Sequence, residues 1–351
     1  MRLGVVQRLL GLLLIVFSVT MLPPVGFSLY FADGGAEPFL YAFGVTVITG
    51  FLIWLPVRQH QEELRLRDGF LVVAAFWFGL GSVGALPLLF LETPVLSFTD
   101  AMFEAMSGLT TTGATVLTGL DNLPPSLLYY RQQLQWLGGM GIIVLAVAVL
   151  PMLGVGGMQL YRAEIAGPVK DSKLTPRITE TAKALWYIYL GLTISCGLAY
   201  YGAGMTPFDA LCHAFSTVAI GGFSTHDASI GFFNSATINS IAVVFMFLSG
   251  INFSLHFMAW RGKSVKSYLA DSEFRAYSSG LAALSVAVVA FLYYKGEYPT
   301  LLETISERLF QVVSVATTTG FTTSDFSAWP GAIPVLLLFA SFVGGCAGST
   351  G

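Results

Sequence analysis

Charged side chains are scarce in this chain. Asp, Glu, Lys and Arg together make up 11% of the 351 residues, whereas 55% of the residues are hydrophobic. Soluble domains carry roughly 25% charged residues, so this composition excludes an ordinary soluble protein. The hydrophobic residues gather in segments of about 20 residues, the length that crosses the apolar core of a bilayer. We therefore expect an all-α polytopic membrane protein.

Cysteines and recognisable catalytic motifs are also nearly absent. The three cysteines, Cys196, Cys212 and Cys346, lie among apolar or small residues, without the spacing of a metal site or of a disulfide framework. The four histidines are scattered along the chain. No zinc-protease motif, phosphate-binding glycine loop or nucleophile elbow occurs. The sequence therefore predicts neither an enzyme nor an organic cofactor, and the cysteines are assigned to packing.

The hydrophobic segments also predict how the chain crosses the membrane. They lie at about 6–30, 39–57, 69–91, 127–151, 182–203, 236–260, 274–294 and 329–348, the last of them interrupted. Of the 17 Lys and Arg residues, all but Arg131, Lys295 and Arg308 lie near the start of the first segment or around the loops after the second, fourth and sixth. Positive charges of this kind stay in the cytoplasm, so the N-terminus is predicted to be cytoplasmic.

Three short stretches share one pattern, in which an acid is followed by a serine seven residues later and by a glycine six further on. They are Asp100, Ser107 and Gly113; Asp209, Ser216 and Gly222; and Glu307, Ser314 and Gly320. Self-similarity at a fixed period predicts a repeated structural unit. Each glycine lies in a short polar run between apolar segments. Non-helical backbone is tolerated at membrane depth only where it is buried in protein or lines a water-filled cavity.

The segment before each glycine is too short to cross a bilayer. Residues 100–109, 209–218 and 307–316 each contain ten residues, which at about 1.5 Å per residue reach half of a 30 Å core. We expect three re-entrant half-helices that enter from the outside, with the acid in the first turn near the positive end of the helix dipole. The repeated serine near the buried end is expected to bond the preceding turn or the following loop.

The loops at the repeated glycines are suited to a dehydrated cation. Backbone carbonyls supply oxygen ligands without charge, and glycine permits the angles that turn them to one side. Threonines precede the first and third glycines, but apolar residues replace them before Gly222. This favours carbonyls over hydroxyls as ligands. The candidate ligands are the two residues before each glycine: Thr111, Thr112, Ile220, Gly221, Thr318 and Thr319.

A glycine-rich run at the end of the chain, 344–351, looks like a fourth loop but lacks the repeated pattern. The positions of the serine and the acid before Gly348 hold Phe342 and Val335. Several glycines make a continuous helix costly, at about 1 kcal/mol each relative to alanine. We therefore predict that this run is a broken stretch of the last span.

The motifs at 108–115, 219–227, 317–323 and 344–351, taken together and in this order, resemble the Trk/Ktr/HKT potassium transporter family, most closely its bacterial TrkH branch. The resemblance implies repeated helix–half-helix–filter–helix units around a pseudo-fourfold pore, of which three of four are present here. It also implies that K+ is the transported ion, that Gly113, Gly222 and Gly320 are selectivity glycines, and that an intramembrane gating loop lies below the filter. That loop would comprise Gly344, Gly345, Cys346, Ala347, Gly348, Ser349, Thr350 and Gly351.

The resemblance further implies the organisation and the partners of the protein. The units would be a peripheral two-helix unit at 1–68 and pore repeats at 69–165, 166–270 and 271–351. Proteins of this kind are homodimers in the lipid of the bacterial inner membrane, work with a cytosolic TrkA-type nucleotide-binding regulatory protein, and bind no nucleic acid. We expect a C-terminally truncated form, with roughly 130 further residues and a fourth unit encoded by the parent gene.

Two transport functions fit these features, and a third class of function stays open. The first is channel-like potassium uptake through the filter. The second is a secondary transporter that couples potassium to sodium or protons, because such carriers place their sites at broken helices near the midplane. A scaffold or membrane enzyme would need no ordered filter. A reversal potential that shifts with a second ion would favour the coupled carrier over the channel.

Overall fold

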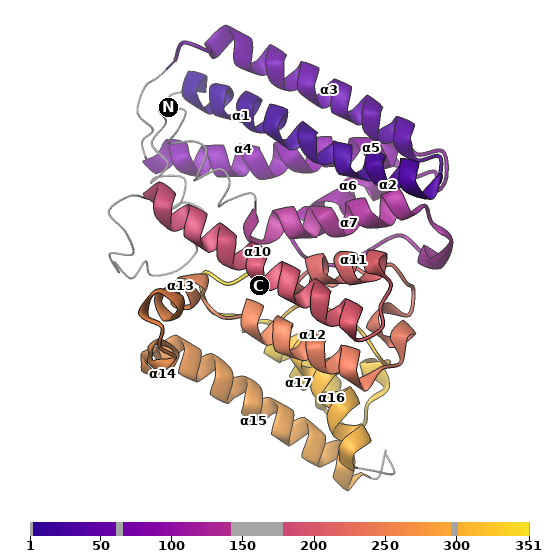
Figure 1. Ribbon diagram of the computed structural model, residues 1–351, viewed down its shortest axis with the longest axis vertical. Helices are drawn as coiled ribbons and strands as arrows, with labels where there is room; N and C mark the ends of the chain where they lie inside the picture. Colours follow the sequence, from indigo (N-terminus) through magenta and orange to yellow (C-terminus); the bar gives the residue numbers. More distant parts are fainter. Residues whose placement is uncertain (1–2, 61–65, 142–177, 296–300, 351) are drawn as a thin grey trace. The chain divides into compact units, whose positions relative to one another are not determined.

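The computed structural model describes residues 3–60, 66–141, 178–295 and 301–350, and every regular element in these ranges is a helix (Figure 1). This confirms the all-α class that the composition predicts. The chain divides into two compact units. The first comprises residues 1–110 and 114–186, and the second comprises residues 111–113 and 187–351. The short stretch 111–113, which contains the first repeated glycine, therefore packs with the second unit.

The first unit is a set of packed helices. They are α1 (Leu3–Ser18), α2 (Leu22–Phe31), α3 (Ala36–Trp54), α4 (Leu66–Gly84), α5 (Leu86–Phe90), α6 (Phe98–Leu109) and α7 (Pro125–Trp136), which continues as a π-helical turn at Leu137–Gly141. Helix α1 lies against α3 and α4, and α6 lies against α4 and α7. Apolar side chains such as Phe39, Leu80 and Leu134 fill the space between them.

Glycines allow α1 and α3 to approach each other closely. A Cβ atom built on Gly11 would lie 2.7 Å from the backbone nitrogen of Trp54, and one on Gly50 would lie 2.9 Å from the carbonyl oxygen of Gly11. Small residues at such crossings are typical of membrane helices, because association there depends on close packing rather than on the hydrophobic effect. No side chain fits at Gly11 without a shift of the α3 backbone.

A carboxylate closes the turn between α2 and α3. Asp33 accepts hydrogen bonds from the Ser28 hydroxyl and from the backbone nitrogens of Gly35 and Ser126, the last at 2.9 Å. Burial alone would raise the pKa of Asp33, but these hydrogen bonds outweigh it and lower the pKa below its usual value. The stabilisation is therefore present at neutral pH and is lost as the pH falls and the carboxylate is protonated.

The second unit carries the remaining helices. They are most of α10 (Ile178–Gly202), then α11 (Pro207–Val218), α12 (Ala236–Ser249), α13 (Phe253–Gly262), α14 (Lys266–Ala270), α15 (Ser272–Tyr294), α16 (Leu301–Ala316) and α17 (Ile333–Ser341). Helix α16 lies against α12, α15 and α17, while α11 lies against α12. Helices α11 and α16, which precede the second and third repeated glycines, thus both pack on α12.

Five helical segments of the described ranges are long and apolar enough to cross a membrane. They are Leu3–Phe31, Ala36–Val57, Leu71–Phe90, Lys183–Gly202 and Ser272–Tyr294. The predicted span at 127–151 is described only as far as Gly141, and its remaining residues lie outside the described ranges. These segments support the reading of the chain as a multi-pass membrane protein.

The predicted unbroken span at 236–260 is wrong. Helix α12 ends at Ser249 and α13 begins at Phe253, with a bend of 91° between them. The break coincides with a contact to a distant part of the chain, because the carbonyl of Gly250 accepts a hydrogen bond from the backbone nitrogen of Cys346 (2.8 Å) instead of continuing the helix. The Asn252 side chain then caps α13 by accepting from the nitrogen of Ser254 (2.8 Å).

We predict that Gly11→Val destabilises the protein, because the new side chain would collide with the backbone of α3. Overpacking of this kind typically costs about 1–3 kcal/mol. Thermal unfolding of the purified protein in detergent measures the effect. The matched control is Gly44→Val in α3, where a Cβ atom meets nothing within 4 Å. Equal losses of stability in the two variants would contradict close α1–α3 packing as the cause.

Candidate ion-binding site

Each of the three short helices ends four residues before its repeated glycine. Helix α6 ends at Leu109, α11 at Val218 and α16 at Ala316, as the sequence predicts. The first two begin with equivalent caps: Ser97 and Thr206 accept from the backbone nitrogens of Asp100 and Asp209, both at 3.1 Å. Each cap hydroxyl also donates to the carboxylate of that aspartate at 2.7 Å. The acid therefore lies in the first turn in these two repeats.

The third repeat departs from this prediction. Helix α16 begins at Leu301, so Glu307 lies in the body of the helix and not in its first turn. Its side chain is 45% exposed and lies 3.9 Å from that of Arg308. The residues from Leu301 to Ser306 include no proline or glycine, so nothing in this stretch opposes a longer helix.

The loops at the three glycines share one backbone conformation. The dihedral φ is 53° at Thr111, 54° at Ile220 and 66° at Thr318, and it is again positive two residues later, at 75°, 77° and 82° for Gly113, Gly222 and Gly320. The residue between them has no positive φ in any repeat. The sign of φ therefore alternates along these three residues in every loop, and alternation of this kind can turn successive backbone groups to one side of the chain.

Capping of the half-helix explains the first left-handed residue. In the second repeat, the nitrogen of Gly221 donates to the carbonyl of Ser216 (2.8 Å) and that of Ile220 donates to Thr217 (3.1 Å), which is the hydrogen-bond pair of a Schellman cap. Glycine or asparagine usually holds this position, and positive φ at a β-branched isoleucine is a strained exception. Such strain persists only where the surroundings impose it, and it is frequent at functional sites.

Carbonyl oxygens from different repeats converge on the glycines. A Cβ atom on Gly113 would collide with the carbonyl oxygen of Gly221 and would lie 3.6 Å from that of Thr319, and one on Gly222 would collide with the carbonyl oxygen of Thr319. Gly320 faces open space. The Gly221 carbonyl of the second repeat thus lies against Gly113 of the first repeat. The Thr319 carbonyl of the third repeat lies against Gly222 of the second. The structure therefore brings the predicted loops 111–113, 220–222 and 318–320 together within the second unit.

Hydroxyl groups near the loops mostly serve the backbone. The Thr110 and Thr317 hydroxyls donate to carbonyls of their own helices at 2.7 and 2.8 Å. Of the repeated serines, Ser314 donates across to the carbonyl of Phe321 (2.7 Å) as expected. The hydroxyls of Ser107 and Ser216 are buried without a hydrogen-bond partner among the described residues, so the expectation fails there. Carbonyls, rather than these side chains, are the groups that all three loops share.

A repeated polar position was missed in the sequence. Glu104, His213 and Gln311 each lie nine residues before a repeated glycine, and each is fully buried. Aligning the three repeats on their glycines places these polar residues in one column, three residues before the repeated serine, and this shared column is a signal that could have revealed them. All three side chains bond the segment that follows the glycine.

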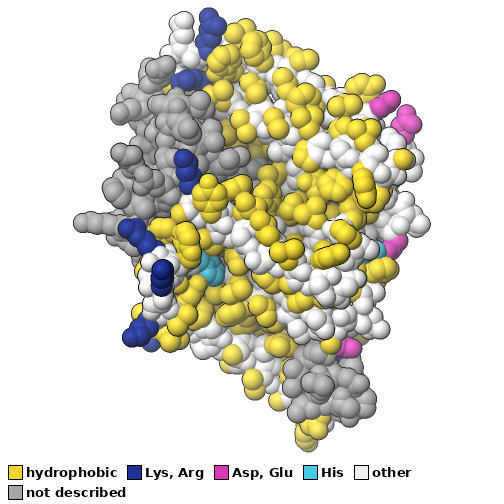
Figure 2. Space-filling model, in the orientation of Figure 1, with side chains coloured by type: hydrophobic (Ala, Val, Ile, Leu, Met, Phe, Trp, Pro, Cys, Tyr) yellow, Lys and Arg dark blue, Asp and Glu magenta, His cyan; other side chains and the backbone are white. Residues whose placement is uncertain are grey.

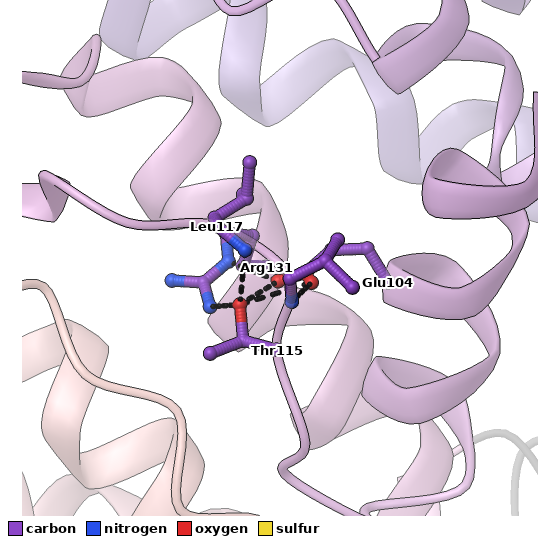
Figure 3. A network of polar contacts seen from close by, with 5 residues as sticks. Glu104, Thr115, Leu117 and Arg131 are labelled. Atoms are coloured by element: carbon purple, nitrogen blue, oxygen red, sulfur yellow. Dashed lines mark hydrogen bonds and ion pairs between the residues drawn. The ribbon is translucent and has the colours of Figure 1, made fainter. Parts of the chain in front are cut away.

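The first of these contacts is a buried network (Figure 3). The Glu104 carboxylate pairs with Arg131 of α7 at 2.7 Å, and the two side chains are 0% and 1% exposed. Glu104 also accepts from the Thr115 hydroxyl (2.9 Å) and from the nitrogen of Val116 (3.1 Å), while Thr115 accepts from the nitrogen of Leu117 (3.0 Å). The network joins α6, α7 and the segment after the first loop, so Glu104 is a structural ion partner.

The corresponding contacts in the other repeats use different chemistry. In the second, the His213 imidazole lies 2.9 Å from the Ser224 hydroxyl. In the third, Gln311 accepts from the nitrogen of Thr323 (3.3 Å). Arg308, on the same helix as Gln311, donates to Ser324 at 3.1 Å, so it too has a structural role.

The glycine-rich run after α17 is not helical. Its glycines Gly344 and Gly348 have φ of 59° and 80°, and the run docks into the break between α12 and α13. The Gly348 carbonyl accepts from the nitrogen of Phe253 (3.1 Å), and the nitrogen of Ala347 donates to the Glu273 carboxylate (2.7 Å). The structure describes this run as far as Thr350, and Gly351 lies outside the described residues.

The Thr350 hydroxyl connects this run to a half-helix. It lies 2.9 Å from the carbonyl oxygen of Val218, the last residue of α11, and 3.2 Å from that of Ser249. Carbonyls at helix ends lack intrahelical partners, so the hydroxyl satisfies an otherwise free group. In the described residues, no three His, Cys, Asp or Glu side chains gather as a metal site.

We predict that Arg131→Met destabilises the protein by about 3–5 kcal/mol, because it leaves the Glu104 carboxylate buried without a counter-charge. Thermal unfolding in detergent measures this loss. Combining Arg131→Met with Glu104→Gln removes both charges and should recover a large part of it. A double variant that is less stable than Arg131→Met alone would contradict an ion pair as the essential contact.

Comparisons with known proteins agree with this geometry. The family model described as "TrkH: Cation transport protein" matches residues 36–351. The chain is 60% identical over 351 residues to the Trk system potassium uptake protein TrkH of Halomonas elongata and 55% identical to that of Escherichia coli K12, covering all of this chain and 73% of each relative.

A solved structure is similar as well. The crystal structure of the potassium transporter TrkH from Vibrio parahaemolyticus matches with a TM-score of 0.89 and 53% identity, over 100% of this chain and 72% of that one. The resemblance drawn from the four motifs is therefore confirmed, and the family is one of transport proteins rather than enzymes. This chain belongs to the TrkH family of cation transport proteins.

Proposed function

We propose that this protein takes up potassium ions across the membrane through a filter lined by backbone carbonyls. Relatives that match the whole chain are named potassium uptake proteins. The observation that carries the proposal is the pair of positive φ angles, two residues apart, that recurs at 111–113, 220–222 and 318–320. An isoleucine in one loop and threonines in the others adopt the same strained angle, so the conformation itself, rather than the side chains, is what the three loops have in common.

The proposed ligands are the carbonyls of the two residues before each glycine. In this proposal Thr111, Thr112, Ile220, Gly221, Thr318 and Thr319 replace the hydration shell of K+, and Gly113, Gly222 and Gly320 permit the close approach of neighbouring loops. The half-helices end just before these loops, so the partial negative charge of their C-terminal ends favours a cation there. No charged side chain is needed among the ligands.

The relation between neighbouring loops also supports a ring of repeats. Gly113 faces a carbonyl of the second loop and Gly222 faces one of the third, while Gly320 faces open space. A fourth loop against Gly320 would complete a pseudo-fourfold filter of the kind that the family resemblance implies. In the same proposal residues 1–68 form a peripheral unit, and 69–165, 166–270 and 271–351 form pore repeats.

We assign a gating role to the run from Gly344 to Gly351. Its contacts with Val218, Gly250 and Glu273 tie it to the end of a half-helix, to the α12–α13 break and to the first turn of α15. Movement of α15 or of the α12–α13 break would therefore displace this run through these hydrogen bonds. A bistable element of this kind is what gating requires.

The regulator and the membrane orientation belong to the same proposal. Exposed basic residues Arg261, Lys263 and Lys266 gather around α13 and α14 (Figure 2), which fits a cytoplasmic location of these helices. The N-terminus would then also be cytoplasmic, and the protein would lie in the bacterial inner membrane as a homodimer. A cytosolic TrkA-type nucleotide-binding protein would act on the cytoplasmic side.

We predict that Gly113→Ser, Gly222→Ser and Gly320→Ser each weaken the discrimination of potassium over sodium. A side chain at these left-handed positions costs roughly 1–2 kcal/mol, and at Gly113 and Gly222 it would also collide with a carbonyl oxygen. Competition between the two ions for uptake, in the protein as its gene encodes it, measures the change.

A matched control separates the filter from backbone strain in general. Gly204 also has positive φ, at 102°, but a Cβ atom there meets nothing within 4 Å. Gly204→Ser should leave selectivity unchanged. Unchanged selectivity in all three filter variants would overturn the filter, and a reversal potential that shifts with sodium or pH would favour a coupled carrier instead.

We predict that Thr350→Val raises the basal potassium flux. Valine has the same shape but cannot bond the Val218 carbonyl. A lost hydrogen bond of about 1 kcal/mol would lower the ratio of closed to open protein by roughly fivefold. Flux in the absence of any regulator measures the change. Thr193→Val is the control, because the Thr193 hydroxyl donates within its own helix, to the Tyr189 carbonyl at 2.8 Å. Flux at the wild-type level in Thr350→Val would contradict a latch at this position.

A further inference from the structure

The polar residue nine positions before each loop glycine is the strongest unexplained feature of the fold. Glu104, His213 and Gln311 are each 0% exposed. A buried polar side chain is costly unless it is hydrogen-bonded, yet one recurs at the same position in all three half-helices. Their chemistry differs, because one is a carboxylate, one an imidazole and one an amide. What they share is the segment that they bond.

That segment comprises the residues that lie two to four positions after each glycine. Glu104 accepts from the backbone nitrogen of Val116 at 3.1 Å, and Gln311 accepts from that of Thr323 at 3.3 Å. Both nitrogens lie three residues after the glycine. His213 instead contacts the hydroxyl of Ser224, two residues after its glycine, and that hydroxyl accepts from the nitrogen of His226 at 3.1 Å.

The spacing follows from the geometry of the two elements. A helix rises about 1.5 Å per residue along its axis, so a residue five positions before the end of a half-helix lies roughly 7–8 Å from that end. Extended chain returns at about 3.3 Å per residue, so two or three residues after the glycine cover a similar distance. A polar side chain at this helical position therefore faces the returning chain in every repeat.

We infer that Glu104, His213 and Gln311 are positioning residues for ion selectivity, which fix the filter carbonyls by holding the chain just after each glycine. The inference rests on the proposed function, because it assigns these residues to the same filter. Each loop is then anchored on both sides: the cap of the half-helix holds the residues before the glycine, and the polar residue holds those after it. Loss of the second anchor frees the carbonyls to adapt to a smaller ion.

Residues can be exchanged between repeats to test this. In His213→Gln and Gln311→His, each repeat receives the side chain that bonds the chain after the glycine in the other repeat. In His213→Leu and Gln311→Leu, the new side chain fills the space without polar atoms. We expect the leucine variants to lose about fivefold in potassium-over-sodium selectivity, the ratio that corresponds to about 1 kcal/mol. The exchanged variants should stay within about twofold of the wild type.

The control is a buried polar residue that packs on the same half-helix from outside the repeat's loop. Tyr200 of α10 is 0% exposed, and its hydroxyl lies 2.8 Å from that of Thr217. Tyr200→Phe should lower thermal stability but leave selectivity unchanged. If it lowers selectivity as much as His213→Leu does, selectivity follows stability alone and the inference is overturned.

Two further outcomes decide the remaining cases. If His213→Leu does not fold, Ser224→Ala removes the partner of His213 on the returning chain and should give the same loss of selectivity. Full selectivity in the leucine variants, or in Ser224→Ala, would overturn the inference while leaving the filter intact. A wild-type protein that does not prefer potassium would instead overturn the proposed function itself.

Discussion

A carbonyl at the end of a helix has no partner within that helix, and inside a membrane water does not replace it. The second unit meets this constraint where α11 and α16 end among buried residues. In α11 and α16, the carbonyls of Ser216 and Ser314 accept from Gly221 (2.8 Å) and Gly320 (3.2 Å) of the loops that follow. The chain must curl back on itself to make these bonds, and left-handed residues are the consequence. The conformation of the proposed filter thus follows from the way the half-helices end.

The same constraint limits what can follow each loop. Once the chain has curled, it runs beside the half-helix that it has just capped, and its N–H groups need acceptors there. Glu104 and Gln311 supply them directly, whereas His213 acts through Ser224. In the first repeat the acceptor is a charge, and the buried Arg131 balances it at 2.7 Å. Uncharged acceptors in the other repeats need no such counter-ion.

Much of the site could be predicted from the sequence because it depends on local rules. The ends of the half-helices at Leu109, Val218 and Ala316 follow from the length of the segments and from the loops after them. The start of α16 could not be placed in this way, since nothing before Glu307 stops a helix. The role of Gln311 was equally hidden, because a polar residue is informative only when three repeats are aligned on their glycines.

The bend at Gly250 depends on residues far away in the chain, and the local sequence of 236–260 reads as one span. The carbonyl of Gly250 is taken by Cys346, and the nitrogen of Phe253 is taken by Gly348. Each partner lies nearly 100 residues further on, in a run whose own glycines prevent a helix. Two broken stretches therefore satisfy each other's backbone groups. Separation of the two would expose unpaired backbone groups on both sides, which favours the docked arrangement that the structure shows. Because the Thr350 hydroxyl also bonds the carbonyl of Val218 at the end of α11, it connects this docked run to the half-helix that precedes Gly222.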